Sequence, residues 1–511
     1  MIASRIRTLT CGVGAGCALA LLASASLWVS PAPSDVAGTA LSAHPSQIQL
    51  ACPAGIVDPF DTSNVAAATA WTSTLAAPVS PAPALVTGEA GVIPSALSIA
   101  GQGGGELAGL SAVGCAAPRT SQWIATGATT SGADIVLLLS NPGPTASVVS
   151  VDGFGASGRL NTAPRQVTVP AGSTASVLLA GWFPDESALA VHVQADGGGV
   201  AAWAQASLMN GEIPQGTTLA SASVPAASHT ILGIDPRGTS LLRLVSPSGD
   251  ARVRVWVADS SGVHLLPGGE ATVAEGTTLD MPLDGASNDS APIALLVTAD
   301  QDVVAHTTTI TLGAPWAERA SAWIMRANAT PTTSLTEAAI PGRKQLQDAA
   351  TSVLSSAPIR DTSLATESGV TAVRAHLLLY VPAQAAGSMP QPQGPAPQSG
   401  TPTQAPTPDI WSSPSPTQPQ SDPAQDPQSS GTSPSTPGAV AVRIGERTVY
   451  VAPGIPTLVE APDAAGHILA QSPIHAAIVV SADTAVGTMS TTWNVGTEGI
   501  SAVTGDIRLT N

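Results

Sequence analysis

The sequence, 511 residues long, is poor in aromatic and charged side chains. Aromatic residues make up 3% of it and charged residues 10%, whereas roughly a quarter of the residues of an average soluble protein are charged. A packed core must therefore be built from aliphatic side chains, which bring the hydrophobic share to 43%. Lysine occurs once, at Lys344, and the formal net charge is −17. Such an acidic chain should repel nucleic acid and anionic lipid surfaces, so we expect no nucleic-acid partner.

The sequence also lacks the common catalytic motifs. It has no Gly-x-Ser-x-Gly nucleophile elbow, no His-Glu-x-x-His pair and no EF-hand calcium loop. A Ser-x-x-Lys acyl-enzyme is excluded because Pro341 stands three residues before the only lysine. The glycine-rich GQGGGE at Gly101 has neither a following Lys-Ser/Thr nor an expected strand before it, so we expect no phosphate-binding loop there. Its composition predicts a flexible loop. We therefore predict no catalytic residue, no cofactor and no metal site, and a protein that is not an enzyme.

Residues 1–30 predict an export segment. Arg5 and Arg7 precede an uncharged stretch from Thr8 to Val29. One interpretation is a signal peptide cleaved after the small residues at Ala23–Ala25. The other is a retained signal-anchor helix, because the stretch is long enough to span a bilayer. Both place the remainder outside the cytoplasm, either secreted or held at the cell membrane by this segment.

Cysteine is scarce, and only two of the four cysteines lie beyond the export segment. In an oxidising compartment Cys52 and Cys115 are expected to form one disulfide. The alternative is a free thiol nucleophile. The bond would close a loop of roughly 60 residues, which the loop-entropy model values at about 4 kcal/mol.

Three segments share a turn glycine between two runs of alternating apolar residues, at Gly172, Gly276 and Gly454. This is the pattern of two half-buried strands joined by a turn. An Ala-Asp signature follows each glycine, after 23 residues in the first two segments and 28 in the third. Matched spacing predicts an internal repeat. The aspartates of this signature are Asp196, Asp300 and Asp483.

A strand-ending proline precedes each turn glycine, by 30 residues at Pro142, 29 at Pro247 and 72 at Pro382. A Pro/Ser/Gln-rich tract fills the excess in the third segment. We predict that residues 387–438 are a disordered loop inside the third repeat and that the strands HLLLYV and AVAVRI pair across it. Trp411 in this tract is either a docking motif or an incidental residue.

These patterns predict an all-β fold of three tandem immunoglobulin-like antiparallel β-sandwich repeats. An irregular N-terminal extension precedes them, and SNVAAATAWTSTLAA within it has the composition of a helix starting near Ser63. RKQLQDAATSVLSS predicts a second helix, with Leu346, Ala350, Val353 and Leu354 on one face. The expected ranges are 31–117 for the extension and 118–212, 213–320 and 321–511 for the repeats.

Three residue types are candidates for site residues: histidine, aspartate and tryptophan. The four histidines at strand positions, His192, His306, His376 and His475, are spread over the repeats, which favours isolated histidines over a metal site. The Ala-Asp aspartates are typical of turn residues that accept backbone hydrogen bonds, as opposed to cation ligands. Trp203 and Trp493 are either core residues or a carbohydrate platform, and we predict core.

The order and spacing of four motifs resemble a family of secreted actinobacterial proteins of unknown function, DUF5719. The motifs are ACPAGI at Ala51, LLLSNPG at Leu137, VTVPAGS at Val167 and HVQADGGGV at His192, and the likeness runs from about Ala51 to Trp493. The resemblance implies an exported, envelope-associated protein without known activity. It supplies no catalytic residues.

We therefore expect a noncatalytic extracytoplasmic protein that binds or scaffolds envelope components. Its partner would be an unknown envelope protein or glycan. Two alternatives stay open: an enzyme with an interdomain site that sequence motifs miss, and a passive surface spacer.

Overall fold

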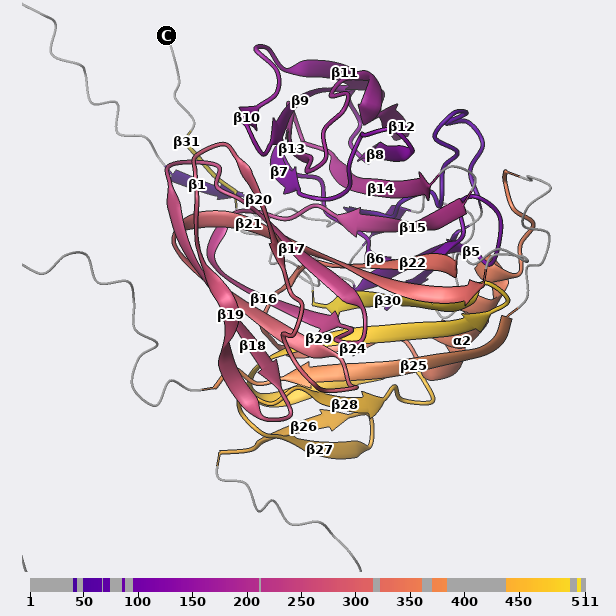
Figure 1. Ribbon diagram of the computed structural model, residues 1–511, viewed down its shortest axis with the longest axis vertical. Helices are drawn as coiled ribbons and strands as arrows, with labels where there is room; N and C mark the ends of the chain where they lie inside the picture. The colour runs from indigo at the N-terminus through magenta and orange to yellow at the C-terminus, as the bar shows by residue number, and fades with distance from the viewer. Residues whose placement is uncertain are drawn as a thin grey trace, which may run out of the picture. The chain divides into compact units, whose positions relative to one another are not determined.

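The computed structural model (Figure 1) describes residues 40–43, 49–66, 68–73, 85–87, 95–210, 213–315, 322–360, 370–383, 438–496 and 503–506. The export segment and nearly all of the tract 387–438 lie outside the described residues. The chain divides into two units. The smaller contains one antiparallel pair, β1 (Ala40–Ala43) with β31 (Val503–Asp506). The larger spans Ser46–Gly499 and contains every other element described below.

The described fold is all-β, and its strand ladders are antiparallel, as predicted. Three sections follow one another, and in each of them two groups of strands enclose a core of aliphatic side chains. Among the described residues, no helix is both long and apolar enough for a membrane span. Burial alternates along the strands because successive side chains point to opposite faces of a sheet. This accounts for the alternating apolar residues in the sequence.

The first section has two sheets around a core that includes Leu137, Val151 and Val193. One sheet has the order β10 (Gly158–Arg159), β9 (Ser147–Gly155), β13 (Ala190–Ala195), β7 (Ser121–Ile124), with β11 (Arg165–Val169) also paired to β9. The other has the order β12 (Ser173–Leu178), β8 (Ala133–Asn141), β14 (Ala201–Asn210), β15 (Ile213–Ser221). A single 3-10 turn, η1 (Leu179–Gly181), follows β12.

The second section is built around one long strand, β21 (Ile293–Pro315), which takes part in both of its strand groups. The first half of β21 pairs with β18 (Ala251–Asp259) and β16 (Ala226–Ile234), flanked by β19 (Gly262–Val273) and β23 (Pro331–Thr332). Its second half pairs with β17 (Thr239–Val245) and β22 (Ala322–Ala329), and β20 (Thr278–Pro282) pairs with β17.

The third section repeats this plan around β29 (Gly466–Thr484). The first half of β29 pairs with β26 (Val440–Ile444) and β24 (Leu335–Ile340), and β27 (Arg447–Val451) pairs with β26. The second half pairs with β25 (Val370–Tyr380) and β30 (Gly487–Val495), and β28 (Thr457–Glu460) pairs with β25. Helix α2 (Arg343–Leu354) buries Leu346, Ala350, Val353 and Leu354, the face that the sequence predicts.

The N-terminal part has more regular structure than expected. Strands β3 (Ala68–Thr72), β5 (Ala96–Gln102) and β6 (Gly109–Gly114) form a sheet, and β2 (Gln49–Ala51) pairs with β4 (Leu85–Thr87). Cys52 and Cys115 form the predicted disulfide. One face of β5 and β6 packs into the core of the third section, and the other packs on Trp203 and Leu138 of the first. Trp203 and Trp493 are buried, as predicted.

The structure corrects two local predictions in this N-terminal part. The described part of SNVAAATAWTSTLAA is not a helix, because buried Ala68, Ala70 and Thr72 alternate with partly buried positions along strand β3. GQGGGELAG is not a flexible loop. It is a buried turn in which a Cβ on Gly103 would lie 2.4 Å from the carbonyl oxygen of Leu354.

Two predictions about the third section were also wrong. HLLLYV and AVAVRI do not pair across the tract, because β25 and β26 belong to different strand groups, as β8 and β9 do in the first section. Asp483 does not follow the strand that Asp196 follows. Ala470 pairs with Val442 as Ala195 pairs with Val149, so Gln471 takes that place. Strand pairing also places β15, which ends at Ser221, in the first section, and β22 and β23, which end at Thr332, in the second. These are one strand and two strands beyond the expected borders at 212 and 320.

Candidate binding groove

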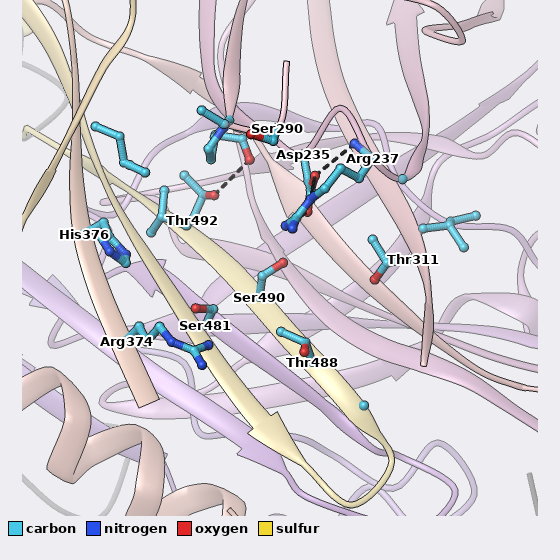
Figure 2. Close-up of a pocket in the computed structure, with 18 of the residues that line it drawn as sticks. Asp235, Arg237, Ser290, Thr311, Arg374, His376, Ser481, Thr488, Ser490 and Thr492 are labelled. Carbon is cyan, nitrogen blue, oxygen red and sulfur yellow. Dashed lines mark hydrogen bonds and ion pairs between the residues drawn. The ribbon is translucent and has the colours of Figure 1, made fainter. Parts of the chain in front are cut away.

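A polar groove of about 990 Å³ lies between the second and third sections (Figure 2). Its floor is the outer face of β25, β29 and β30, and its wall comes from the β16–β17 loop, the residues before β21 and the second half of β21. Beside the groove the two sections are in contact, where Leu232 and Ala294 meet Leu378 and Tyr380. The groove therefore begins where these two packed faces diverge.

The floor is polar because of strand alternation. Ile478, Val480 and Ala482 of β29 point into the core, so Val479, Ser481 and Asp483 face outward. Ladder pairing then sets Arg374 beside Ser481 and Ser481 beside Ser490 across three strands. The same register sets Asp483 opposite Thr488 and Val479 opposite Thr492. The result is a surface of hydroxyl groups with one guanidinium at its side.

Arg374 is held by an ion pair on the floor. Its Nη2 donates to Oδ2 of Asp483 at 2.7 Å, and the Thr488 hydroxyl donates to Oδ1 of the same carboxylate at 2.9 Å. These hydrogen bonds, first that from Arg374 and then that from Thr488, lower the pKa of Asp483 below its ordinary value. The carboxylate therefore stays charged at neutral pH and fixes the direction of the guanidinium, whose side chain is 53% exposed.

Arg237 is held in the same way on the opposite wall. Its Nε and Nη2 donate to the two carboxylate oxygens of Asp235 at 3.0 and 2.8 Å. Burial by itself would raise the pKa of Asp235, but the hydrogen bonds from Arg237 outweigh it and the pKa lies below its ordinary value. Figure 2 shows Arg237 and Arg374 reaching in from opposite sides, with Ser490 between them. Two oriented guanidinium groups thus face a hydroxyl-lined floor.

Two leucines add an apolar margin to the groove. Leu312 on the wall is 78% exposed, and Leu458 on β28 is partly exposed. His376 lies on the floor strand β25, and no groove hydroxyl hydrogen-bonds to its imidazole within the described part of the chain. The arrangement suits recognition of a polar ligand by hydrogen bonds and charge, with limited apolar contact.

The family model for DUF5719, a family of unknown function, matches residues 73–386, which is more than half of the chain. The chain belongs to this family. No curated protein and no solved structure shows significant similarity to it. The match is narrower than the span expected from the motifs, and it ends at the start of the Pro/Ser/Gln tract.

The DUF5719 match covers only part of the groove. Asp235, Arg237 and Arg374 lie within the matched residues, whereas Asp483 and the hydroxyls of β29 and β30 lie beyond them. The wall and the first floor strand, β25, therefore lie within the residues that the family model matches. The remainder of the floor comes from residues C-terminal to the match.

The histidines do not converge. His306 is fully enclosed near the first section, and burial lowers its pKa to about 4. Burial likewise lowers the pKa of His475 to about 4, although the ring is hydrogen-bonded to the Thr332 hydroxyl. The residues that the structure describes contain no cluster of three or more metal-ligating side chains.

His192 has the most suggestive surroundings of the histidines. Its Nε2 lies 2.8 Å from Oγ of Ser121, and its ring stacks on Trp123 with centroids 4.4 Å apart. Burial lowers its pKa, opposed by the nearby charge of Asp152. Asp152, opposite His192 on the neighbouring strand, accepts hydrogen bonds from Arg159 and Asn161.

The aspartates of the first two Ala-Asp signatures have the structural role that the sequence predicts. Asp196 accepts a hydrogen bond from the backbone N–H of Val148, and Asp300 accepts one from the N–H of Arg252, each at 2.7 Å. Sequence reasoning missed Asp235, Arg237 and Arg374. The alternation that leaves Ser481 and Asp483 facing outward was readable, but the facing wall depends on a contact between sections that no local pattern encodes.

Proposed function

We propose that this protein is a noncatalytic, extracytoplasmic, envelope-associated binding or scaffolding protein, and that the groove between its second and third sections is the binding surface. The observation that carries the proposal is the pair of guanidinium groups on opposite sides of one hydroxyl-lined floor. Each is oriented beforehand by a carboxylate, which reduces the ordering cost of gripping a ligand. A passive spacer would have no need of such a site.

The finer architecture supports a rigid platform for this site. We infer that the three sections are copies of one immunoglobulin-like sandwich. Support comes from the ladder register. In each section one valine pairs with a residue on the strand before the turn glycine and with a residue on the second strand after it. The equivalent sets are Val149 with Val167 and Ala195, Val253 with Ala271 and Ala299, and Val442 with Val449 and Ala470.

Retention of envelope fragments tests the proposal. Purified protein would be incubated with envelope fragments of the source organism, and the bound fraction would be measured by cosedimentation. Ser490→Trp fills the centre of the groove and should abolish retention. Thr174→Trp, at the exposed position of strand β12 in the first section, places the same side chain away from the groove and should bind as the unmodified protein does. Equal retention of both variants, or none by the unmodified protein, would refute the binding function.

An enzyme with an interdomain site is the second candidate. The groove does bring ionisable groups together from two sections. Outside the groove, within the first section, the Ser121–His192 hydrogen bond places a hydroxyl within reach of a base, as in a nucleophile pair. A fluorophosphonate probe separates the two ideas. We expect no stoichiometric labelling of any serine. Labelling of Ser121 that disappears in His192→Ala would establish a hydrolase and overturn the noncatalytic function.

A further inference from the structure

The groove's two arginines have donors that the protein does not use. A guanidinium carries five N–H groups. Arg237 gives two hydrogen bonds to the carboxylate of Asp235 from its side chain, and Arg374 gives one to Asp483. Most donors of both side chains are therefore available to a ligand. The side chains are 69% and 53% exposed, so a bound group can reach them without rearrangement.

The charge pattern selects the kind of anion. Each arginine stands beside one carboxylate, so the four groups together carry no net charge. A dense polyanion with two charges on each group would meet Asp235 and Asp483 at short range, and repulsion would offset its attraction to the arginines. Singly charged carboxylates spaced along a chain can each engage one guanidinium as a bidentate pair and stay clear of the other acid.

The floor between the arginines determines which chemical groups can lie between the ligand's two carboxylates. Ser481, Ser490, Thr488 and Thr492 present hydroxyl groups to the groove. Thr488 and Thr492 already donate to Asp483 and to the carbonyl of Gly233, so they can only accept from a ligand, whereas Ser481 and Ser490 can donate and accept. A chain of sugar rings presents matching hydroxyls. A volume near 1,000 Å³ is at the upper end of small-ligand clefts, and the groove is open, so it can hold a segment of a longer polymer.

We propose that the groove binds an acidic polysaccharide through carboxylates held by Arg237 and Arg374 and through sugar hydroxyls held by the serine and threonine floor. This inference rests on the proposed binding function and names the ligand class of the same site. The protein as a whole is acidic, so attraction is local to the groove and should weaken as salt is raised.

Calorimetric titration with three polymers tests the proposal. The full exported chain would be titrated with oligomers of polygalacturonate, with neutral dextran and with polyphosphate, at low and moderate salt. We expect binding of polygalacturonate that weakens with salt, and no comparable binding of the other two. Equal binding of dextran would remove the role of the carboxylates. Tighter binding of polyphosphate would reassign the site to phosphate polymers.

Matched variants locate the binding. Arg237→Ala and Arg374→Ala should each weaken polygalacturonate binding about tenfold or more, because each removes a charge-assisted pair. Arg159→Ala removes a partly exposed arginine that is paired with Asp152 on the first section, and should have no effect. Arg237→Lys and Arg374→Lys keep the charge and lose the fork, and should bind with intermediate affinity. Unchanged affinity in both alanine variants would overturn the proposal.

Two further experimental results bear on the acidic-polysaccharide inference. Arg237 is on an exposed loop, so Arg237→Ala decides the question even if Arg374→Ala lowers the melting temperature. If the unmodified protein ignores polygalacturonate while Ser490→Trp still abolishes retention of envelope fragments, the acidic-polysaccharide inference fails and the binding function stands.

Discussion

At the scale of single residues, the stability of this protein depends on polar groups enclosed where sections meet. His306 lies opposite Arg243 on the neighbouring strand, only 3% exposed, and its Nε2 has no hydrogen-bond partner. An imidazole in such a place is neutral, because burial disfavours the charged form.

The pH dependence of folding should report His306. Its folded pKa of about 4 lies below its ordinary value of 6.5, so the folded state binds fewer protons than the unfolded state between these values. The neutral ring favours the folded state above pH 6.5, and this contribution is lost as pH falls toward 4, by an amount on the order of 3 kcal/mol. Urea unfolding at pH 7.5, 5.5 and 4.5 measures it. His306→Leu should show a shallower fall than the unmodified protein, and parallel curves would contradict the assignment.

Gly109 should not tolerate a side chain. A Cβ there would lie 2.0 Å from the carbonyl oxygen of Thr217, and both backbones are fixed in their strands. We expect Gly109→Ala to lower the free energy of unfolding by about 1–3 kcal/mol. Gly198→Ala is the matched control, since nothing lies within 4 Å of its added Cβ. Chemical denaturation of the two variants compares them, and an equal effect would mean that β6 and β15 can separate at little cost.

At the scale of elements, the sequence predicted what alternation or helical spacing could show. The face of α2 was readable because Leu346, Val353 and Leu354 stand among polar residues. Strand β3 was misread because alanine marks both its buried positions and its surroundings, so composition favoured a helix. Pairing partners were less accessible, because sequence alone does not tell a hairpin from a connection that crosses between strand groups.

We still expect the Pro/Ser/Gln tract to be removable under the corrected topology. The described residues on either side of it lie at the turn around Gly454. The N–H of Gly454 donates to the carbonyl of Val381 at 2.8 Å, and a Cβ on Gly438 would lie 3.8 Å from Pro453. A short link can therefore replace residues 387–437. Shortening the loop about tenfold should reduce the entropic free-energy cost of closing it by about 2 kcal/mol.

Thermal melting of the chain with residues 387–437 replaced by NPGP tests this expectation. We expect a melting temperature equal to or above that of the unmodified protein. Separation of the third section into two transitions, or its loss, would show that the tract does more than connect β25 to β26.

At the scale of the whole larger unit, small apolar clusters recur where neighbouring sections meet. Ala125, Ala190 and Val245 pack together between the first and second sections, at the same strand positions where Leu232, Ala294 and Tyr380 pack between the second and third. The sequence predicted a repeat but not this contact between sections, because the contact depends on outer-face residues that a single repeat gives no reason to bury. The groove was missed for the same reason.

Arg243 makes the polar contact between the first and second sections. Its guanidinium donates to both oxygens of Asp280 and to the carbonyls of Gly127 and Leu189. Arg243→Ala leaves these acceptors without their donor, and we expect a loss of about 2–4 kcal/mol. Calorimetric unfolding should show the first section melting apart from the others. Arg159→Ala serves as the control, and a single unshifted transition in Arg243→Ala would contradict the assignment.

Strands β5 and β6 share one core with the third section, and this sets when their apolar face is buried during synthesis. A ribosome makes Leu97 and Leu110 long before it makes Trp493 and Val480, against which the core closes. The strands made among the first are thus among the last to be covered, and every unfinished chain displays an apolar face that the finished one hides. This exposed apolar face allows a chaperone or a protease to distinguish an unfinished chain from a finished one.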